Sequence, residues 1–130
     1  MILFESPLIR LEYTPATDIL LADLSNRNEF YALELKEIFR MISTTVRHYD
    51  VKRLLMDSRN RIIAISDEEY AVLMENYLQD LQNTRLEKLA RLKTGVSSRE
   101  GLAKQNKETV FSFALETFMD KEMATEWLLL

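Results

Sequence analysis

The chain of 130 residues contains no cysteine, a single histidine, two glycines and two prolines. The absence of cysteine excludes disulfides, thiolate metal sites and thiol nucleophiles. The sequence also contains no Walker loop, no glycine-rich dinucleotide fingerprint and no pair of histidines at a metal-binding spacing. Because the usual signatures of nucleotide, metal and thiol chemistry are missing, we expect no cofactor and no metal.

Long apolar runs are also missing. No segment approaches the roughly 18 apolar residues that are needed to span a bilayer. The segment Met1-Ile-Leu-Phe4 is apolar, but Glu5 and Pro7 follow at once, so it is too short for the core of a signal peptide. We therefore expect a cytoplasmic protein without a membrane span.

The chain does contain enough apolar sequence for one core. Its length suits a single domain over residues 1–130, since domains most often have about 100–150 residues. Apolar residues make up 47% of the sequence and charged residues 29%, which argues against intrinsic disorder.

Charge is unevenly distributed along the chain. The net charge of −4 disfavours nucleic-acid binding. Residues 85–107 nevertheless combine seven basic with two acidic residues, which gives a local charge of +5. The basic residues are Arg85, Lys88, Arg91, Lys93, Arg99, Lys104 and Lys107. We interpret this segment as a solvated face, with a surface for an acidic partner as the alternative.

Several short segments fit β-strands. Residues 2–5 and 9–13 flank Ser6-Pro7, and in the second segment Ile9, Leu11 and Tyr13 alternate with charged residues. Residues 19–24 and 53–57 fit more deeply buried strands. Residues 86–93 suit a helix or a strand by residue type, and a β-α-β alternation favours a strand over 88–93. Residues 113–118 fit an edge strand.

Two longer helices are predicted between these strands. The first covers residues 28–49 and is capped by Asn26 or Asn28. Its apolar stripe consists of Tyr31, Leu35, Ile38, Ile42, Val46 and Tyr49. The second helix begins at the capping box Ser66-Asp-Glu-Glu69, in which Ser66 accepts a hydrogen bond from the backbone of Glu69. Its stripe consists of Tyr70, Leu73, Met74, Tyr77, Leu78 and Leu81.

The last third of the chain predicts two further helices. Residues 94–101 fit a loop that contains both glycines, and residues 102–112 fit a helix. Asp120 can cap a final helix that ends near Leu130. The predicted fold is therefore a single α/β domain with a mixed central sheet and helices packed against it, in the order β-β-β-α-β-α-β-α-β-α.

This order and several motifs resemble a known group of proteins. The motifs are the apolar third strand, the segment Leu54-Leu-Met-Asp-Ser-Arg59, the aromatic-bearing second long helix and the closing segment from Phe118 to Leu128. Together they are similar to the STAS/SEC14-like group, in the SpoIIAA-like branch named for bacterial anti-sigma-factor antagonists. The resemblance implies the STAS/SpoIIAA-like fold and a regulatory protein-binding or lipophile-carrying role.

One position departs from that family. In anti-sigma-factor antagonists the corresponding strand ends in Asp-Ser-Ser-Gly, and the second serine is phosphorylated. Here Asp57-Ser58 is followed by Arg59-Asn60, so an arginine occupies the switch position and the glycine is absent. The resemblance leaves Ser58 as a phosphoacceptor candidate, and a turn serine is the alternative.

The predicted topology also suggests a binding site. If the strands at 19–24, 53–57 and 88–93 are parallel, the loops that follow them meet at one edge of the sheet. Arginine side chains and helix N-termini at such an edge suit a carboxylate or a phosphate. We expect a binding rim centred on Arg59, although ordinary solvated connections would explain the same loops. The rim residues are Arg27, Asp57, Ser58, Arg59, Asn60, Arg61 and Arg99.

Enzyme activity is not expected. Ser58 would need a neighbouring base to act as a nucleophile, and His48 is the single histidine. The predicted topology puts these residues at opposite ends of the strand 53–57, roughly 17–20 Å apart at about 3.3 Å per residue. Direct proton transfer is excluded at that distance.

The sequence therefore predicts a non-enzymatic bacterial interaction or regulatory module. It would recognise a protein partner or a small anion through the loops after the third and fourth strands. A carrier of a small lipophile is the alternative, because Phe39, Met41, Met74 and Tyr77 lie on the two long helices. The apolar segments Met1–Phe4 and Trp127–Leu130 would either close the core or pair two copies in a homodimer.

Overall fold

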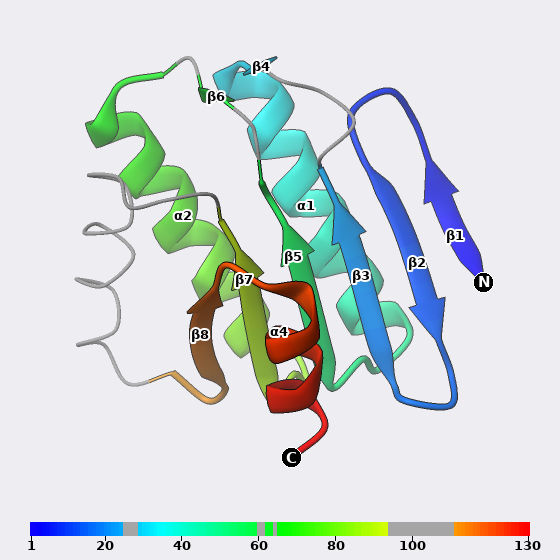
Figure 1. Cartoon of the computed structure of the whole chain (residues 1–130). Helices are drawn as coiled ribbons and strands as arrows, with labels where there is room; N and C mark the ends of the chain where they lie inside the picture. Colours follow the sequence, from blue (N-terminus) through cyan, green and yellow to red (C-terminus); the bar gives the residue numbers. More distant parts are fainter. Residues whose placement is uncertain (25–28, 60–61, 64, 94–110) are drawn as a thin grey trace.

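A six-stranded sheet forms the centre of the computed structural model, which describes residues 1–24, 29–59, 62–63, 65–93 and 111–130 (Figure 1). Its strands lie in chain order across the sheet, and the strands β3, β5, β7 and β8 are parallel while β1 and β2 are antiparallel to their neighbours. The strands are β1 (Ile2–Glu5), β2 (Arg10–Thr14), β3 (Ile19–Asp23), β5 (Arg53–Asp57), β7 (Lys88–Leu92) and β8 (Ala114–Phe118). The predicted mixed sheet is confirmed, including the strand within 86–93 and the edge position of β8.

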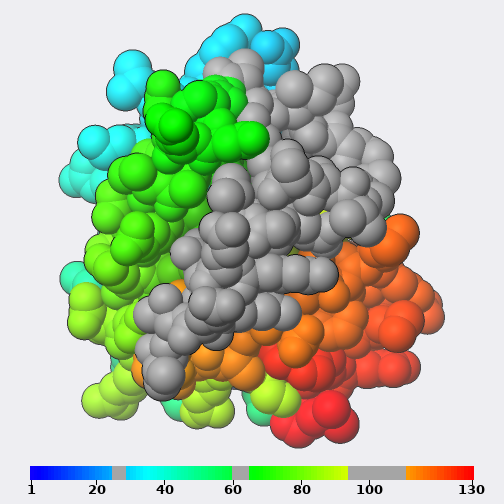
Figure 2. Space-filling model, turned by 90° about the vertical axis from the view of Figure 1, so that its left-hand side faces the viewer, coloured from blue at the N-terminus to red at the C-terminus, as the bar shows by residue number. Residues whose placement is uncertain are grey.

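Helices cover both faces of this sheet. The helices α1 (Ala32–His48) and α2 (Asp67–Gln82) pack on one face, and α4 (Lys121–Leu128) packs on the other face over β5 and β7 (Figure 1). A second, two-stranded parallel sheet joins β4 (Glu29–Phe30) to β6 (Ile62–Ile63). Figure 2 looks onto the side of the molecule formed by α2 and by the β8–α4 segment.

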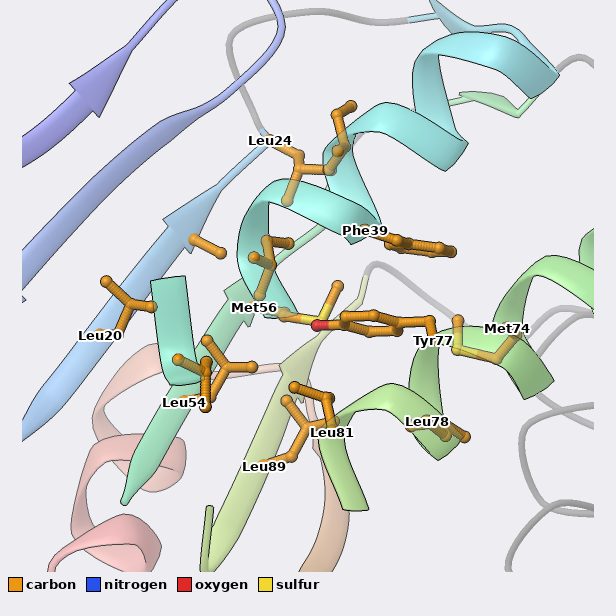
Figure 3. Close-up of a cluster of buried hydrophobic side chains, with 14 of the residues drawn as sticks. Leu20, Leu24, Phe39, Leu54, Met56, Met74, Tyr77, Leu78, Leu81 and Leu89 are labelled. Atoms are coloured by element: carbon orange, nitrogen blue, oxygen red, sulfur yellow. The ribbon is translucent and has the colours of Figure 1, made fainter. Parts of the chain in front are cut away.

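The alternation of side chains along the strands divides the core into two layers. On β5, Leu54 and Met56 face α1 and α2, whereas Leu55 faces α4. The larger layer lies under α1 and α2 and contains Phe39 and Tyr77 (Figure 3). Because β5 is buried on both faces, its three central residues, Leu54–Met56, are all apolar, as expected for an inner parallel strand.

The first long helix begins later than the sequence predicts. The prediction placed its start at about residue 28 with Asn26 or Asn28 as the cap, but α1 begins at Ala32 with Tyr31 as the N-cap. Residues 29–30 form β4 instead, and Phe30 is completely buried in the core. The pairing of β4 with β6 involves residues more than thirty positions away, so local helix propensity could not reveal it. Tyr31 and Tyr49, the ends of the predicted stripe, are 51% and 45% exposed.

The other two helix starts agree with the prediction. The Ser66 hydroxyl accepts a hydrogen bond from the backbone N–H of Glu69 at 3.1 Å and caps α2. The carboxylate of Asp120 accepts from the backbone N–H of Glu122 at 2.8 Å and caps α4. Both caps depend on a hydrogen bond within a single turn of chain, which a sequence pattern can identify.

The loop predicted for residues 94–101 lies outside the described residues, as does most of the helix predicted for 102–112. Phe111 and Ser112, the described end of that predicted helix, are not helical. The two rings of Phe111 and Phe113 stack at 5.4 Å just before β8. Among the helices that the structure describes, none is long and apolar enough to cross a membrane.

Candidate functional site

The carboxyl ends of the parallel strands meet at one edge of the sheet, as the sequence predicts. Backbone hydrogen bonds continue past the strands there: Leu24 donates to the Asp57 carbonyl at 2.9 Å, and Ser58 donates to the Leu92 carbonyl at 3.1 Å. The next bond joins the Lys93 N–H to the Phe118 carbonyl at 3.0 Å. These bonds fix the first residues after β3, β5 and β7 relative to one another, so side chains leaving this edge start from a rigid frame.

Asp57 and Arg59 form a bidentate ion pair at this edge. The Arg59 Nε donates to Oδ1 of Asp57 at 2.9 Å, and Nη2 donates to Oδ2 at 2.8 Å. The Arg59 backbone N–H also donates to Oδ1 at 3.3 Å. The carboxylate side chain is only 6% exposed, whereas the Arg59 side chain is 36% exposed. The pair therefore holds the turn after β5 while about a third of the Arg59 side chain stays exposed to solvent.

The ion pair shifts the pKa values of both partners. Burial by itself raises the pKa of Asp57, but the hydrogen bonds and the charge of Arg59, with a contribution from Lys121, outweigh burial and leave this pKa below its ordinary value. The hydrogen bond to Asp57 raises the pKa of Arg59, and the carboxylates of Asp23 and Asp120 add to this effect. The edge on the α4 face therefore combines carboxylates from β3, β5 and the start of α4 with two cations.

This arrangement changes the expected chemistry of Arg59. A free arginine fork would suit a small anion, but here two N–H groups of the fork are committed to Asp57. Three carboxylates surround Arg59, which lowers the electrostatic attraction for a second anion. The described part of the predicted rim is a mixed-charge surface.

Ser58 points into the protein. The residue is only 6% exposed, and its hydroxyl donates a hydrogen bond to the Leu92 carbonyl at 3.1 Å. A kinase would have to displace this hydrogen bond and pull the residue out of the sheet edge to reach the hydroxyl. The geometry therefore favours the turn-serine interpretation, and phosphorylation of Ser58 stays a prediction.

The remaining rim residues lie outside the described part of the chain. They are Arg27, Asn60, Arg61 and Arg99. Their convergence with Arg59 stays a prediction.

His48 lies where the sequence predicts it, at the last position of α1, and its ring packs edge-on against Tyr49 with centroids 4.8 Å apart. β5 runs from Arg53 to Asp57 between this end of the molecule and Ser58. The two residues therefore occupy opposite ends of the strand and do not form a catalytic pair. Among the described residues, no group of three or more metal-ligating side chains is close enough to hold a metal ion.

The residues that suggested a lipophile pocket pack against one another. The rings of Phe39 and Tyr77 stack, and the Tyr77 hydroxyl donates to the sulfur of Met56 at 2.9 Å (Figure 3). Met74 is 2% exposed in the same layer. Met41 instead lines an open groove of about 460 Å³ between α1 and the β1–β2 strands. In the part of the core drawn in Figure 3, protein side chains thus occupy the space that a lipophile would need.

The basic segment 85–107 is not uniformly solvated: Lys88 is half-buried, and the prediction is wrong for Arg91. The Lys88 ammonium donates to the carbonyls of Trp127 and Leu130 at 2.9 and 3.1 Å and so satisfies the end of α4. Arg91 is buried, with 1% of its surface exposed. The sequence does indicate the burial of Arg91, because Arg91 comes two residues after the apolar Leu89 and therefore lies on the same face of the strand. That signal was hidden by the run of charges around it.

The two apolar chain ends lie on different parts of the molecule. Met1–Phe4 belongs to the outer strand β1 and its flank, where Ile2 and Phe4 are 51% and 40% exposed. At the other end, Leu128 is the last residue of α4 and is completely buried between this helix and the sheet, so it closes the core there. Pairing of two copies through these ends stays a prediction.

Comparisons with known proteins support the fold. No protein-family model matches the sequence, and no curated protein shows detectable similarity to it. Among solved structures, the chain is similar to an uncharacterized protein of the DUF3478 family, with a SpoIIAA-like fold, from Shewanella loihica PV-4. The two chains share 14% sequence identity with a TM-score of 0.61, and the match covers 96% of this chain and 98% of that chain. The chain therefore has an α/β fold of the SpoIIAA-like type, as its motifs predicted.

Proposed function

We propose that the chain is a non-enzymatic regulatory module that recognises a protein partner at the carboxyl edge of β3 and β5, with Arg59 at the centre of the contact. The SpoIIAA-like fold is consistent with such a role. The observation that carries the proposal is the Asp57–Arg59 pair, which presents a partly exposed arginine side chain on a rigid turn.

A preorganised arginine suits protein recognition. Two hydrogen bonds to Asp57 already fix its side chain, so binding requires little additional loss of conformational freedom. Arginine is enriched among the residues that dominate binding energy at interfaces. The exposed part of the Arg59 side chain can donate hydrogen bonds to a carbonyl or a carboxylate of a partner, or stack on an aromatic ring.

The surrounding charges favour a protein over a small anion. Asp23, Asp57 and Asp120 oppose a free anion, while a protein surface can match positive and negative groups together. A small anion bound at Arg59 is thus the weaker alternative. The lipophile carrier is not proposed, because the aromatic and methionine side chains of the core pack against one another.

The test compares matched arginine variants in the native host. A tagged chain is purified with its bound proteins, and the amount of each co-purifying protein is quantified for the wild type, Arg59→Ala and Arg10→Ala. Arg10 is a suitable control because it is 35% exposed and pairs with Glu12 at 3.1 Å on β2. We expect a partner whose yield falls about tenfold or more with Arg59→Ala and is unchanged with Arg10→Ala.

Folding must be controlled because Arg59→Ala leaves the Asp57 carboxylate buried without its partner. The double variant Asp57→Asn/Arg59→Ala removes both charges and keeps a polar group at the strand end. Circular dichroism melts identify which variants are folded at the temperature of purification. Equal recovery of every partner by a folded variant without Arg59 would overturn the proposal.

A further inference from the structure

Arg91 is a buried cation that the proposed function does not use. It lies on β7 and is the largest of the fully buried side chains, with 1% of its surface exposed. Its Nη2 donates to the Tyr70 hydroxyl at 3.2 Å, whereas Nε is buried and has no hydrogen-bond partner among the described residues. In the described ranges of the chain, no carboxylate forms an ion pair with Arg91.

Among the residues that the structure describes, few groups can compensate the charge of Arg91. Its neighbours across the sheet are Met56 on β5 and Thr117 on β8, and Tyr70 covers it from the first turns of α2. An arginine keeps its charge in proteins, so it cannot escape burial by losing a proton. An isolated charge in such surroundings is strongly unfavourable unless a counter-charge is present. The fold therefore retains a positive group whose complement is an anion.

The position of Arg91 suits a ligand from outside the chain. It is the penultimate residue of β7, close to the carboxyl edge where ligands of open parallel sheets bind. Lys93 lies two residues further along the chain, so the pleat of the strand directs its side chain to the same face of the sheet as Arg91. Lys93 thus adds a second positive charge on that face. Both residues lie on the α1–α2 side of the sheet, whereas the Asp57–Arg59 pair lies on the α4 side.

We propose that Arg91 binds a small oxyanion, a carboxylate or a phosphate group, between β7 and α2. The Nε–H and a terminal N–H of the guanidinium form the fork that such a group accepts, and Tyr70 holds the fork in place through Nη2. This site is separate from the protein-binding edge, and the two proposals can fail independently.

The test measures thermal unfolding and ligand binding with two probes, inorganic phosphate and octanoate. Both are added to the wild-type protein at millimolar concentration, with sodium chloride at equal ionic strength as the reference. We expect at least one probe to raise the Tm of the wild type. A rise with phosphate alone assigns a free phosphate, and a rise with octanoate alone assigns the carboxylate of an apolar molecule.

Variants of Arg91 separate a binding role from a structural role. Arg91→Met replaces the buried cation by an apolar side chain, so in chloride it should be at least as stable as the wild type. Its affinity for the active probe, measured by isothermal titration calorimetry, should be weaker by about tenfold or more because a charge-assisted pair is lost. Arg91→Lys keeps the charge without the fork and should show an intermediate affinity.

Arg53→Met is the matched control. Arg53 also lies on the sheet, but its guanidinium is satisfied by the carbonyls of Leu128 and Thr17 at 2.8 and 2.7 Å. This variant should lose stability in chloride and keep the response to the probe. The proposal is overturned if neither probe stabilises the wild type, or if the probe affinity is the same for Arg91→Met and Arg91→Lys as for the wild type.

Discussion

The rings of Phe39 and Tyr77 stack with their centroids 4.2 Å apart and their planes inclined by 10°, and they join α1 to α2 above the sheet (Figure 3). Both residues are buried, and the Tyr77 hydroxyl also reaches the sulfur of Met56. This contact lies in the larger core layer, and it links the two helices that cover one face of the sheet.

Truncation at this contact should strongly destabilise the protein. We expect Phe39→Ala to lower the free energy of unfolding by about 3–5 kcal/mol, because it removes a buried ring and leaves a cavity. Leu33→Ala on the same helix is the control; Leu33 is 82% exposed, so its change should stay within about 0.5 kcal/mol. Urea unfolding followed by circular dichroism measures both. Equal effects of the two variants would contradict the assignment of the core face of α1.

The Asp57–Arg59 pair should make stability depend on pH in the acid range. The folded pKa of Asp57 is below its ordinary value, so the stabilisation is complete above about pH 4 and is lost as the pH falls through the folded pKa. Asp57→Asn should lower stability at neutral pH by about 1 kcal/mol, since the partner Arg59 is partly screened by solvent. The variant should also lose less stability than the wild type on acidification.

Unfolding in urea at several pH values checks this prediction. Glu12→Gln is the control, because Glu12 pairs with Arg10 on β2 and both side chains are partly exposed. This substitution should change the free energy of unfolding by no more than about 0.5 kcal/mol. An unchanged acid dependence in Asp57→Asn would show that other carboxylates determine the acid response.

The end of α1 contains a strained residue that glycine should relieve. Val51 N–H donates to the Val46 carbonyl at 3.0 Å and Asp50 N–H to the Arg47 carbonyl at 3.4 Å, the bonds of a Schellman cap. Asp50 adopts the left-handed conformation with φ of 51°, which disfavours residues other than glycine. We expect Asp50→Gly to raise the free energy of unfolding by about 1 kcal/mol.

The same substitution elsewhere should act in the opposite direction. Asp80 is exposed inside α2, where Asp80→Gly should lower stability by about 0.5 kcal/mol because glycine is a poor helix former. Chemical denaturation of the two variants side by side measures both signs. A loss of stability in Asp50→Gly would mean that the Asp50 side chain contributes more than its backbone strain removes.

The cap of α4 should depend on the hydrogen-bond acceptor and not on the charge. Asp120→Ala removes the acceptor of the Glu122 N–H and should lower stability by about 1 kcal/mol. Asp120→Asn keeps an acceptor oxygen and should remain within about 0.5 kcal/mol of the wild type. Thermal unfolding at neutral pH compares them. Equal losses in both variants would instead point to the charge of Asp120 beside Arg59.

Local features of the fold could be predicted well from the sequence. Ser66 and Asp120 were identified as caps because each bond spans two or three residues of chain. The buried run of β5 and the parallel order of the strands followed from alternation of elements and from apolar patterning. The start of α1 was wrong because Phe30 pairs with Ile63, a contact between distant parts of the chain.

The candidate site was predicted less completely. Asp57, Ser58 and Arg59 lie at the carboxyl edge as predicted, and Arg59 holds Asp57 there. Binding of an anion at Arg59 stays a prediction. Which way a long flexible side chain turns depends on the charges that the fold assembles around it, and these come from separate elements. For the same reason, the sequence by itself predicts Arg91 to be part of a solvated charge run, whereas the fold buries it.

The amino-acid sequence by itself determined the α/β class, most strands, the main helices and two of their caps, because hydrophobic periodicity and capping depend on neighbouring residues. Only the tertiary structure decided which charges are buried and which partners they meet. Burial and ion pairing depend on the distances between elements, as the enclosed Arg91 under α2 and the Asp57–Arg59 pair at the opposite face show.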